Sequence, residues 1–235
     1  MAGATGVLTI VATPIGNLCD LSPRAASALS QADFWIVEDS RVSGKLQAHL
    51  GIKRPMRVLN DHTPEGRVGE YAAEVAGGKR AALLTDAGTP VVSDPGAELV
   101  GACLELRAEI DAVPGPSAVP TALSLSGFYA QRFAFLGYPP RKPGPLRELL
   151  DPYAESPLTL VFFESPHRVG KLLAACHGSV GARRYAVCRE LTKAHQQVGR
   201  ATLPDTPDEG QGPQKGEVTR GVEGRRSRRE LGARV

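Results

Sequence analysis

The sequence predicts an α/β protein built from two α/β domains with mostly parallel sheets. Three observations lead to this class. Short apolar, β-rich runs alternate with helix-like segments through roughly the first 125 residues. Several of these runs end in clusters of Gly, Pro, Asp or Ser, which is typical of strands that lead into a ligand site. The length of 235 residues, with 42% hydrophobic residues, suits one large domain or two small ones.

Five strands are expected in the first half of the chain. They are Val7–Thr13, Phe34–Val37, Met56–Leu59, Ala81–Thr85 and Ile110–Val113. The helices expected between them start at Ser22-Pro23, an N-cap followed by a first-turn proline, and then cover Ser43–Leu50, Pro64–Ala76 and Ala97–Arg107. The alternation predicts a mostly parallel sheet covered on both faces. Strand ends of one sense lie along one edge of such a sheet, so we expect the loops there to converge on one crevice.

The stretch from Leu83 to Gly96 is the most informative of these loops. A buried strand ends at Asp86, and turn residues follow within a dozen positions, among them Gly88 and Pro90. Glycine lets the backbone approach a ligand closely, and a carboxylate at a strand end is a common ligand contact. The alternative is that Asp86 only caps a turn and the glycines only reverse the chain. Similar loops after other strands favour the ligand site.

A second α/β unit is expected beyond a boundary around residues 122–130, which gives domains of residues 1–124 and 125–224. Its strands are predicted at Thr159–Phe163 and Tyr185–Cys188, and its helix at Val169–Ala175. A stiff, proline-rich loop before them, Leu136–Pro145, presents Arg141 and Lys142. The alternative for this loop is a linker with two solvated cations.

The C-terminal part of the chain reads differently. Residues 204–216 are rich in Pro, Gly, Asp and Gln and are predicted to be unstructured. Glu217–Glu223 is a weak strand candidate, because Arg220 and Gly221 lie inside it. We therefore expect order to end near Leu203, with an unpaired sheet edge or a gap in the second domain. Residues 225–235 form a basic tail.

Charge is distributed unevenly along the chain. Residues 1–130 hold ten Lys and Arg against 14 Asp and Glu, whereas residues 131–200 hold 11 against five. A basic half beside an acidic half predicts that one half contacts a polyanion, the alternative being a solvated basic surface. The four cysteines are widely spaced and indicate reduced residues of a cytoplasmic protein. No apolar run is long enough to span a membrane, and the histidines show no metal-ligand spacing.

Seven motifs in order carry a resemblance to a known family. They are Thr13-Pro14-Ile15-Gly16-Asn17-Leu18 with Asp20, Glu38-Asp39-Ser40-Arg41, Asp86-Ala87-Gly88-Thr89-Pro90, Asp94-Pro95-Gly96, Pro114-Gly115-Pro116-Ser117-Ala118, Phe163-Glu164-Ser165-Pro166-His167-Arg168 and Arg189-Glu190-Leu191-Thr192-Lys193. The chain resembles the ribosomal RNA small subunit methyltransferase I family of the tetrapyrrole-methylase superfamily over roughly residues 7–203. That family methylates a cytidine 2′-hydroxyl of 16S rRNA with S-adenosylmethionine. The absence of a Gly-x-Gly-x-x-Gly motif agrees, because this superfamily does not bind its cofactor in the Rossmann manner.

The resemblance implies a tetrapyrrole-methylase-like fold with the cofactor in the inter-domain cleft, and a homodimer. No metal is expected, because no set of metal ligands is visible in the sequence. By position, the residues that line the cofactor site are Pro14, Gly16, Asn17, Asp86, Ala87, Gly88, Thr89, Ser117 and Ala118. The C-terminus departs from the family pattern, in which a helix and an apolar strand follow the segment matching Gly199–Leu203.

Transfer of a methyl group to a hydroxyl benefits from a base, and the candidates at strand ends are Asp39 and Glu164. The cations expected to orient these carboxylates or to contact RNA are Arg41, Arg141, Lys142, Arg168 and Lys193. Structural salt bridges explain several of the same residues equally well. Two other functions stay open: a methyltransferase that acts on a tetrapyrrole, and an RNA-binding protein that has lost catalysis.

Overall fold

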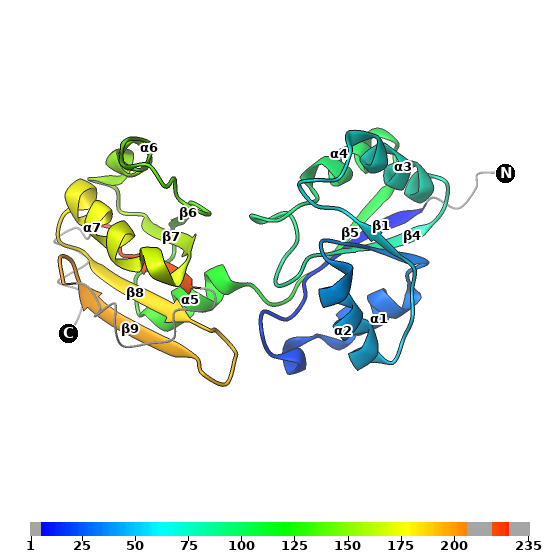
Figure 1. The fold of residues 1–235 in the computed structure, drawn as a ribbon, viewed down its shortest axis with the longest axis horizontal. Helices are drawn as coiled ribbons and strands as arrows, with labels where there is room; N and C mark the ends of the chain where they lie inside the picture. The colour runs from blue at the N-terminus through cyan, green and yellow to red at the C-terminus, as the bar shows by residue number, and fades with distance from the viewer. Residues whose placement is uncertain (1–5, 206–217, 226–235) are drawn as a thin grey trace. The chain divides into compact units, whose positions relative to one another are not determined.

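The computed structural model describes residues 6–205 and 218–225. The chain divides into two compact units, Met1–Ser117 and Ala118–Val235, and each contains one five-stranded sheet (Figure 1). A boundary after residue 124 would instead place most of the helix that begins at Ala118 with the first unit. Within the described ranges, no helix combines the length and the apolar character needed to cross a membrane.

The sheet of the first unit is parallel throughout. Its strands are β1 (Val7–Val11), β2 (Phe34–Val37), β3 (Met56–Val58), β4 (Arg80–Leu84) and β5 (Glu109–Val113), in the order β3-β2-β4-β1-β5. The helices are α1 (Pro23–Gln31), α2 (Ser40–Leu50), α3 (Glu65–Ala76) and α4 (Ala97–Glu105), with a short 3-10 turn η1 (Leu18–Asp20). The alternation of strands and helices predicted from the sequence is confirmed.

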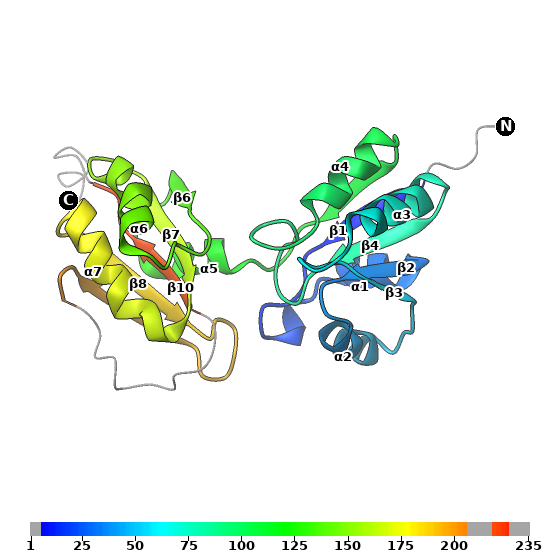
Figure 2. The same ribbon diagram turned by 45° about the horizontal axis from the view of Figure 1, so that its top comes forward.

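Helices cover both faces of this sheet (Figure 2). Leu99 of α4 and Val75 of α3 pack in one apolar cluster with Leu83 of β4. On the other face, Leu29 of α1 packs in a cluster with Trp35 of β2. Fully buried parallel strands carry near-continuous apolar runs, as β2 does, because both of their faces are covered.

The sheet of the second unit is mixed. Its strands are β6 (Phe133–Phe135), β7 (Thr159–Glu164), β8 (Arg184–Arg189), β9 (Gln197–Thr202) and β10 (Val218–Val222), in the order β6-β7-β10-β8-β9. Its helices are α5 (Ala118–Ser126), α6 (Pro143–Leu150) and α7 (Val169–Val180), with 3-10 turns η2 (Asp151–Tyr153) and η3 (Pro166–Arg168). Among the pairings described in this second sheet, β6–β7 is parallel and the other three are antiparallel. The expectation of a mostly parallel sheet therefore describes the first unit and not the second.

The prediction that order ends near Leu203 is wrong for the described residues that follow it. Residues Val218–Val222 form β10, which pairs with β7 on one side and with β8 on the other, and each of its residues is buried. No gap is left beside β7, because β10 fills that position. Residues 206–217, on which most of the disorder prediction rests, lie outside the described residues.

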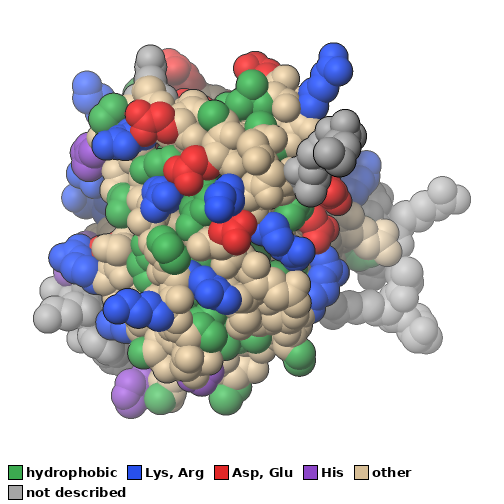
Figure 3. Space-filling model, turned by 90° about the vertical axis from the view of Figure 1, so that its right-hand side faces the viewer, with side chains coloured by type: hydrophobic (Ala, Val, Ile, Leu, Met, Phe, Trp, Pro, Cys, Tyr) green, Lys and Arg blue, Asp and Glu red, His purple; other side chains and the backbone are tan. Residues whose placement is uncertain are grey.

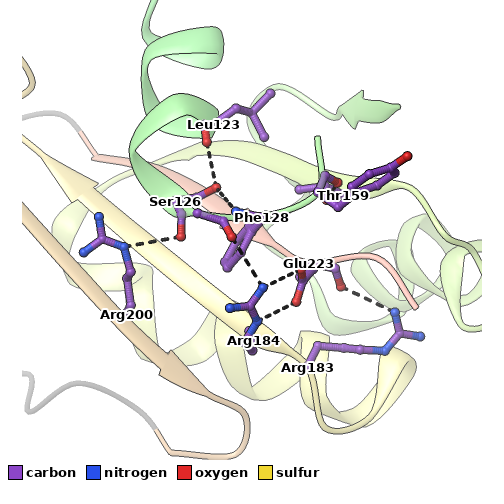
Figure 4. Close-up of polar contacts among 10 residues, drawn as sticks. Leu123, Ser126, Phe128, Thr159, Arg183, Arg184, Arg200 and Glu223 are labelled. Atoms are coloured by element: carbon purple, nitrogen blue, oxygen red, sulfur yellow. Dashed lines mark hydrogen bonds and ion pairs between the residues drawn. The ribbon is translucent and has the colours of Figure 1, made fainter. Parts of the chain in front are cut away.

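Arginines fasten α5 and the segment after it to the second sheet (Figure 4). Arg200 of β9 donates to the carbonyl oxygens of Leu125 and Ser126. These oxygens lie at the end of α5, where carbonyl groups lack partners within the helix. Arg184 of β8 binds both carboxylate oxygens of Glu223, at 2.7 and 2.6 Å. Its guanidinium carbon also lies 5.3 Å from the centre of the Phe128 ring.

Phe128 also explains the glycine in β10. A Cβ atom at Gly221 would lie 3.3 Å from the ring of Phe128. Any larger residue here would displace the ring by a few tenths of an ångström. The glycine that weakened the strand prediction therefore gives the ring room over this strand.

Candidate functional site

Three loops meet at the carboxyl edge of the first sheet. The loops after β1 and β4 exchange two backbone hydrogen bonds, from the Thr13 nitrogen to the Gly88 oxygen at 2.8 Å and from the Gly88 nitrogen to the Thr13 oxygen at 3.1 Å. The loop after β4 also contacts the loop after β5, because Thr89 Oγ1 donates to the Pro116 carbonyl oxygen at 3.2 Å. The convergence expected from the sequence is thus present in the structure.

Two glycines keep these loops close together. Gly88 has a φ of +93°, a conformation that side chains with a Cβ rarely adopt. At Gly115, a Cβ atom would lie 3.1 Å from the Cβ atom of Ala12, at the end of β1. At these two positions the loops therefore present backbone, which fits the close approach of a small ligand.

Glu38 and Asp86 form a pair of carboxylates at this edge. They follow the neighbouring strands β2 and β4, and each carboxylate accepts a backbone hydrogen bond from the other strand's end: the Asp86 nitrogen donates to Glu38 Oε2 at 3.4 Å, and the Asp39 nitrogen donates to Asp86 Oδ1 at 3.2 Å. Burial is the main cause that raises the pKa of Glu38, and the negative charges of Asp86 and Asp94 add to it. Burial likewise raises the pKa of Asp86. A carboxylate with a raised pKa accepts a proton more readily.

Glu38 was missed as a candidate base in the sequence, which favoured its neighbour Asp39. Both residues follow β2, so position alone does not separate them. Asp39 caps α2, since its Oδ1 accepts from the Arg41 nitrogen at 2.8 Å, and it forms an ion pair with the Arg41 guanidinium. The hydrogen bonds from Arg41 lower the pKa of Asp39 to about 2. Asp39 is consequently a weak proton acceptor.

These carboxylates line an open cavity of about 540 Å³ in the first unit. Its lining residues are Glu38, Asp39, Asn60, Asp61, His62, Asp86, Ser93, Asp94 and Pro95. Despite this acidity, no group of three or more His, Cys, Asp or Glu side chains in the described residues is arranged to hold a metal ion. The cavity suits the cationic or hydrogen-donating part of an organic molecule.

Five other residues proposed for the cofactor are half-buried or exposed. Pro14 is half-buried, and Gly16 and Asn17 are exposed in the loop after β1. The Asn17 side chain accepts a hydrogen bond from the Cys19 nitrogen at 3.0 Å and so caps η1. Ser117 ends the first unit and Ala118 begins α5.

Basic residues gather at one edge of the second sheet. Strands β6, β7 and β8 run in the same direction, because β6 is parallel to β7 and β10 is antiparallel to both β7 and β8. Their carboxyl ends therefore share an edge. The predicted cations that follow these ends are Arg141, Lys142, Arg168 and Lys193. Of these, Lys193 lies 3.3 Å from the Glu190 carboxylate, with which it forms an ion pair.

Glu164 is buried at the end of β7 and is engaged on several sides. The Ser165 nitrogen donates to its Oε1 at 2.8 Å, and Arg168 Nη1 lies 3.0 Å from its Oε2. Arg168 Nη2 also donates to the Pro140 carbonyl oxygen at 3.1 Å, which ties the loop after β6 to the loop after β7. Glu164 and Arg168 thus form a structural link as well as a candidate catalytic pair.

Arg220 lies next to this link, in the middle of β10. Its Nη2 donates to the Ser165 carbonyl oxygen at 3.2 Å, and the side chain is fully buried. Burial lowers the pKa of Arg220 to about 10, partly offset by the negative charge of Glu164. In the first unit, by contrast, the face drawn in Figure 3 carries Lys and Arg side chains with Asp and Glu side chains among them, so that face is not uniformly basic.

The fold and the converging loops define a class of protein. The family model for Tetrapyrrole (Corrin/Porphyrin) Methylases matches residues 7–207. Among solved structures, the methyltransferase CobJ superposes with a TM-score of 0.68 at 18% identity, covering 95% of this chain and 97% of its own. A uroporphyrin-III-C-methyltransferase from Thermus thermophilus superposes with a TM-score of 0.66 at 21% identity, covering 93% of this chain and 94% of its own. At these identities the likeness shows a common fold.

Curated relatives narrow the class further. The Ribosomal RNA small subunit methyltransferase I of Synechocystis sp. is 43% identical over 199 residues, which is 84% of this chain and 71% of that protein. The protein of the same name from Mycobacterium bovis is 41% identical over 239 aligned positions, or 99% of this chain and 82% of its own length. The chain belongs to the ribosomal RNA small subunit methyltransferase I family, within the tetrapyrrole methylases.

Proposed function

We propose that this protein transfers a methyl group from S-adenosylmethionine to the 2′-hydroxyl of a cytidine in 16S rRNA of the small ribosomal subunit. The observation that carries this proposal is the identity of 41–43% to ribosomal RNA small subunit methyltransferases I across most of the chain. The fold agrees with it, because β10 completes the second sheet. The gap beside β7, on which the alternative of an inactive RNA-binding protein partly depended, is not found among the described strands.

The first unit would hold S-adenosylmethionine at the three converging loops. The backbone around Gly88 and Gly115 offers close approach and peptide groups for the zwitterionic methionyl part. The Asp86 and Glu38 carboxylates supply negative charge near the cationic sulfonium. When bound, the cofactor supplies an activated methyl group. The residues proposed as its contacts are Pro14, Gly16, Asn17, Asp86, Ala87, Gly88, Thr89, Ser117 and Ala118.

The 2′-hydroxyl must lose its proton during transfer. We place Glu38 first among the candidate bases, because burial and neighbouring acids raise its pKa. Asp39 and Glu164 stay as the sequence-derived candidates, but each carboxylate is bound by an arginine, Arg41 and Arg168 respectively. An arginine lowers the basicity of the carboxylate that it contacts. Positioning of the reacting groups is expected to supply much of the catalysis.

The second unit would contact the RNA backbone through the edge where β6, β7 and β8 end. Arg141 and Lys142 are exposed there, and Arg168 lies beside them through its hydrogen bond to Pro140. Phosphate contacts of this kind supply most of the affinity of a protein for nucleic acid. Arg41 and Lys193 are proposed as further RNA contacts. A homodimer and a cytoplasmic location complete the proposal, in agreement with the four free cysteines.

Methyl transfer from radiolabelled S-adenosylmethionine tests the proposed function directly. The protein is incubated with small ribosomal subunits that lack the modification, and the labelled nucleotide is mapped in the 16S rRNA. The expected result is one labelled cytidine that resists alkaline hydrolysis on its 3′ side. Transfer of the label to a tetrapyrrole, with none to RNA, would replace this proposal with the small-molecule methyltransferase.

A further inference from the structure

Tyr138 is an exposed aromatic residue in the loop that follows β6. Its relative exposure is 66%, the highest among the large hydrophobic side chains exposed in the described residues. Exposing an aromatic ring to water is unfavourable, because the ring carries a large apolar surface. A single exposed ring is common on protein surfaces, so the inference depends on what supports this ring and on the charges near it.

The backbone of this loop is held firmly against β7. The Leu136 nitrogen donates to the Val161 oxygen at 2.9 Å, and the Phe163 nitrogen donates to the Gly137 oxygen at 2.9 Å. On the far side of Tyr138, the Pro140 oxygen accepts from Arg168 at 3.1 Å. These contacts on both sides of Tyr138 fix the backbone from which its side chain projects.

The ring itself is supported from one side by other aromatic rings. The centres of the Tyr138 and Phe163 rings are 5.5 Å apart in a tilted arrangement, and Phe135 contacts Phe163 edge-on at 4.8 Å. Phe163 directly precedes Glu164, so the same strand end supports the ring and carries the buried carboxylate. A ring supported in this way loses little conformational freedom when a planar ligand stacks on it.

Three cations belong to this loop or contact it. Arg141 and Lys142 follow it by three and four positions and are both exposed. Arg168 reaches the same loop through Pro140. An exposed ring next to several cations is the combination by which proteins bind single-stranded nucleic acid, with bases stacked on the ring and phosphates paired with the cations.

We propose that Tyr138 stacks on an unpaired nucleobase of the RNA substrate, while Arg141 and Lys142 contact the phosphates that flank it. This inference rests on the proposed function and extends it, because it assigns base contact and phosphate contact to different residues of one loop. Stacking is tolerant of sequence, since every base has a flat face. Tyr138 therefore holds the strand without selecting the nucleotide.

The test measures binding of the full-length protein to a short single-stranded RNA that contains 2-aminopurine, at several salt concentrations. Tyr138→Ala should weaken binding by about 5- to 150-fold, which corresponds to the loss of one base–aromatic stack. The slope of log affinity against log salt should not change, because no phosphate contact is lost. Arg141→Ala should instead reduce that slope by roughly 0.7, the value for one phosphate of a single strand.

Tyr129→Ala is the matched control. Tyr129 is also an exposed tyrosine of the second unit, at 48%, but its carbonyl oxygen accepts from Thr159 at the start of β7, the opposite end of that strand from Tyr138. The Tyr129→Ala variant should therefore have the same RNA affinity as the wild type. Tyr138→Phe and Tyr138→Trp should keep the affinity. The emission of Tyr138→Trp should respond to unlabelled RNA, since the chain has only one other tryptophan, the fully buried Trp35.

Two outcomes would overturn the inference while leaving the proposed function in place. One is equal RNA affinity of Tyr138→Ala, Tyr129→Ala and the wild type. The other is a change of sedimentation in Tyr138→Ala with unchanged RNA affinity, which would assign the ring to contact with a second copy of the chain. Failure of the wild-type protein to bind RNA at any salt concentration would instead contradict the proposed function, and this inference with it.

Discussion

Trp35 in the first unit and Arg220 in the second are the two largest side chains that are fully buried in the described structure. Trp35 lies among apolar neighbours of β2, and its Nε1 donates to the Leu29 oxygen at 2.9 Å. Arg220 lies in β10, where Phe162 and Val187 are its partners on the adjacent strands. Its Nε and Nη1 have no hydrogen-bond partner among the described residues. The surroundings of Trp35 are thus apolar and the polar group of its side chain is satisfied, whereas Arg220 brings a charge with incomplete contacts into the second interior.

The difference follows from the two sheets. All the strands of the first sheet are parallel, so their carboxyl ends lie at one edge. Polar residues collect there, while a buried strand such as β2 stays apolar. In the second sheet β10 runs against its neighbours. This brings a charged residue of β10 beside the loop that follows β7. Arg220 reaches the Ser165 oxygen at that edge from within the sheet. The carboxyl end of β10 lies at the opposite edge, so β10 contributes to this edge through the buried side chain of Arg220.

The largest effect is expected from removing Trp35. Trp35→Ala should lower the free energy of unfolding by about 3–5 kcal/mol, because it leaves a cavity inside a closely packed sheet. Urea titration followed by far-UV circular dichroism measures the loss. Hydrogen exchange should locate it in β1 to β5. Trp35→Phe is the control and should lose less, and a loss below about 1 kcal/mol in Trp35→Ala would contradict tight packing around β2.

The opposite sign is expected at Arg220. Replacing buried ionic groups with apolar side chains is often neutral or stabilising by about 1–4 kcal/mol. Arg220 has two nitrogens without partners, and Glu164 would keep its ion pair with Arg168. Arg220→Met should therefore raise the free energy of unfolding, while Arg220→Ala should lower it, because alanine leaves a cavity. Urea titration of both variants measures the two effects. A clear loss of stability in Arg220→Met would mean that the contacts with Ser165 and Glu164 outweigh the cost of burying the charge.

These two residues also mark what the sequence predicted and what it did not. β2 is a short apolar run, and local composition is enough to assign it as a strand of a parallel sheet. β10 contains Arg220 and Gly221, and local composition argues against it as a strand. Its place depends on β7 and β8, and on the ring of Phe128, which lies more than 90 positions earlier in the chain. Pairing between distant segments decides the structure there, and no window of sequence contains it.

The candidate site shows the same division. The loops after β1, β4 and β5 were recognised because turn residues at a strand end are a local signal. Glu38 was missed, since what distinguishes it from Asp39 is the contact between the ends of two neighbouring strands. Tyr138 was missed for the same reason, because exposure of a ring is decided by the packing around it. The sequence therefore located the edge of the sheet but not the side chains that give that edge its chemistry.

The cofactor prediction compares two aspartates of the first unit, Asp86 at the candidate site and Asp111 in β5. Asp86→Ala should weaken binding of S-adenosylmethionine by about 1–3 kcal/mol, the usual effect of removing a charge-assisted contact. Isothermal titration calorimetry on the folded variant measures it. Asp111→Ala is the matched control, because Asp111 is an exposed aspartate of β5 in the same unit and forms an ion pair with Arg24. Equal affinity in Asp86→Ala and Asp111→Ala would remove Asp86 from the site.

The smallest expected effect is a difference in pH response between Asp39 and Glu38, which follow the same strand. Arg41 lowers the pKa of Asp39 from 3.8 to about 2. The folded state therefore binds a proton at this position less readily than the unfolded state, so the stabilisation is complete above about pH 4 and is lost as the pH falls toward 2. Burial raises the pKa of Glu38 above 4.5, and this shift has the opposite sign. Glu38 costs stability at neutral pH, and the cost disappears as Glu38 becomes protonated.

Urea midpoints between pH 7 and pH 2.5 should show that the wild type loses stability relative to Asp39→Asn as the pH falls. Relative to Glu38→Gln, the wild type should gain stability as the pH falls, and this gain should occur at a higher pH than the loss relative to Asp39→Asn. Parallel curves for the wild type and Glu38→Gln would show that Glu38 is solvated like an ordinary surface carboxylate, and its leading place among the candidate bases would then pass to Glu164.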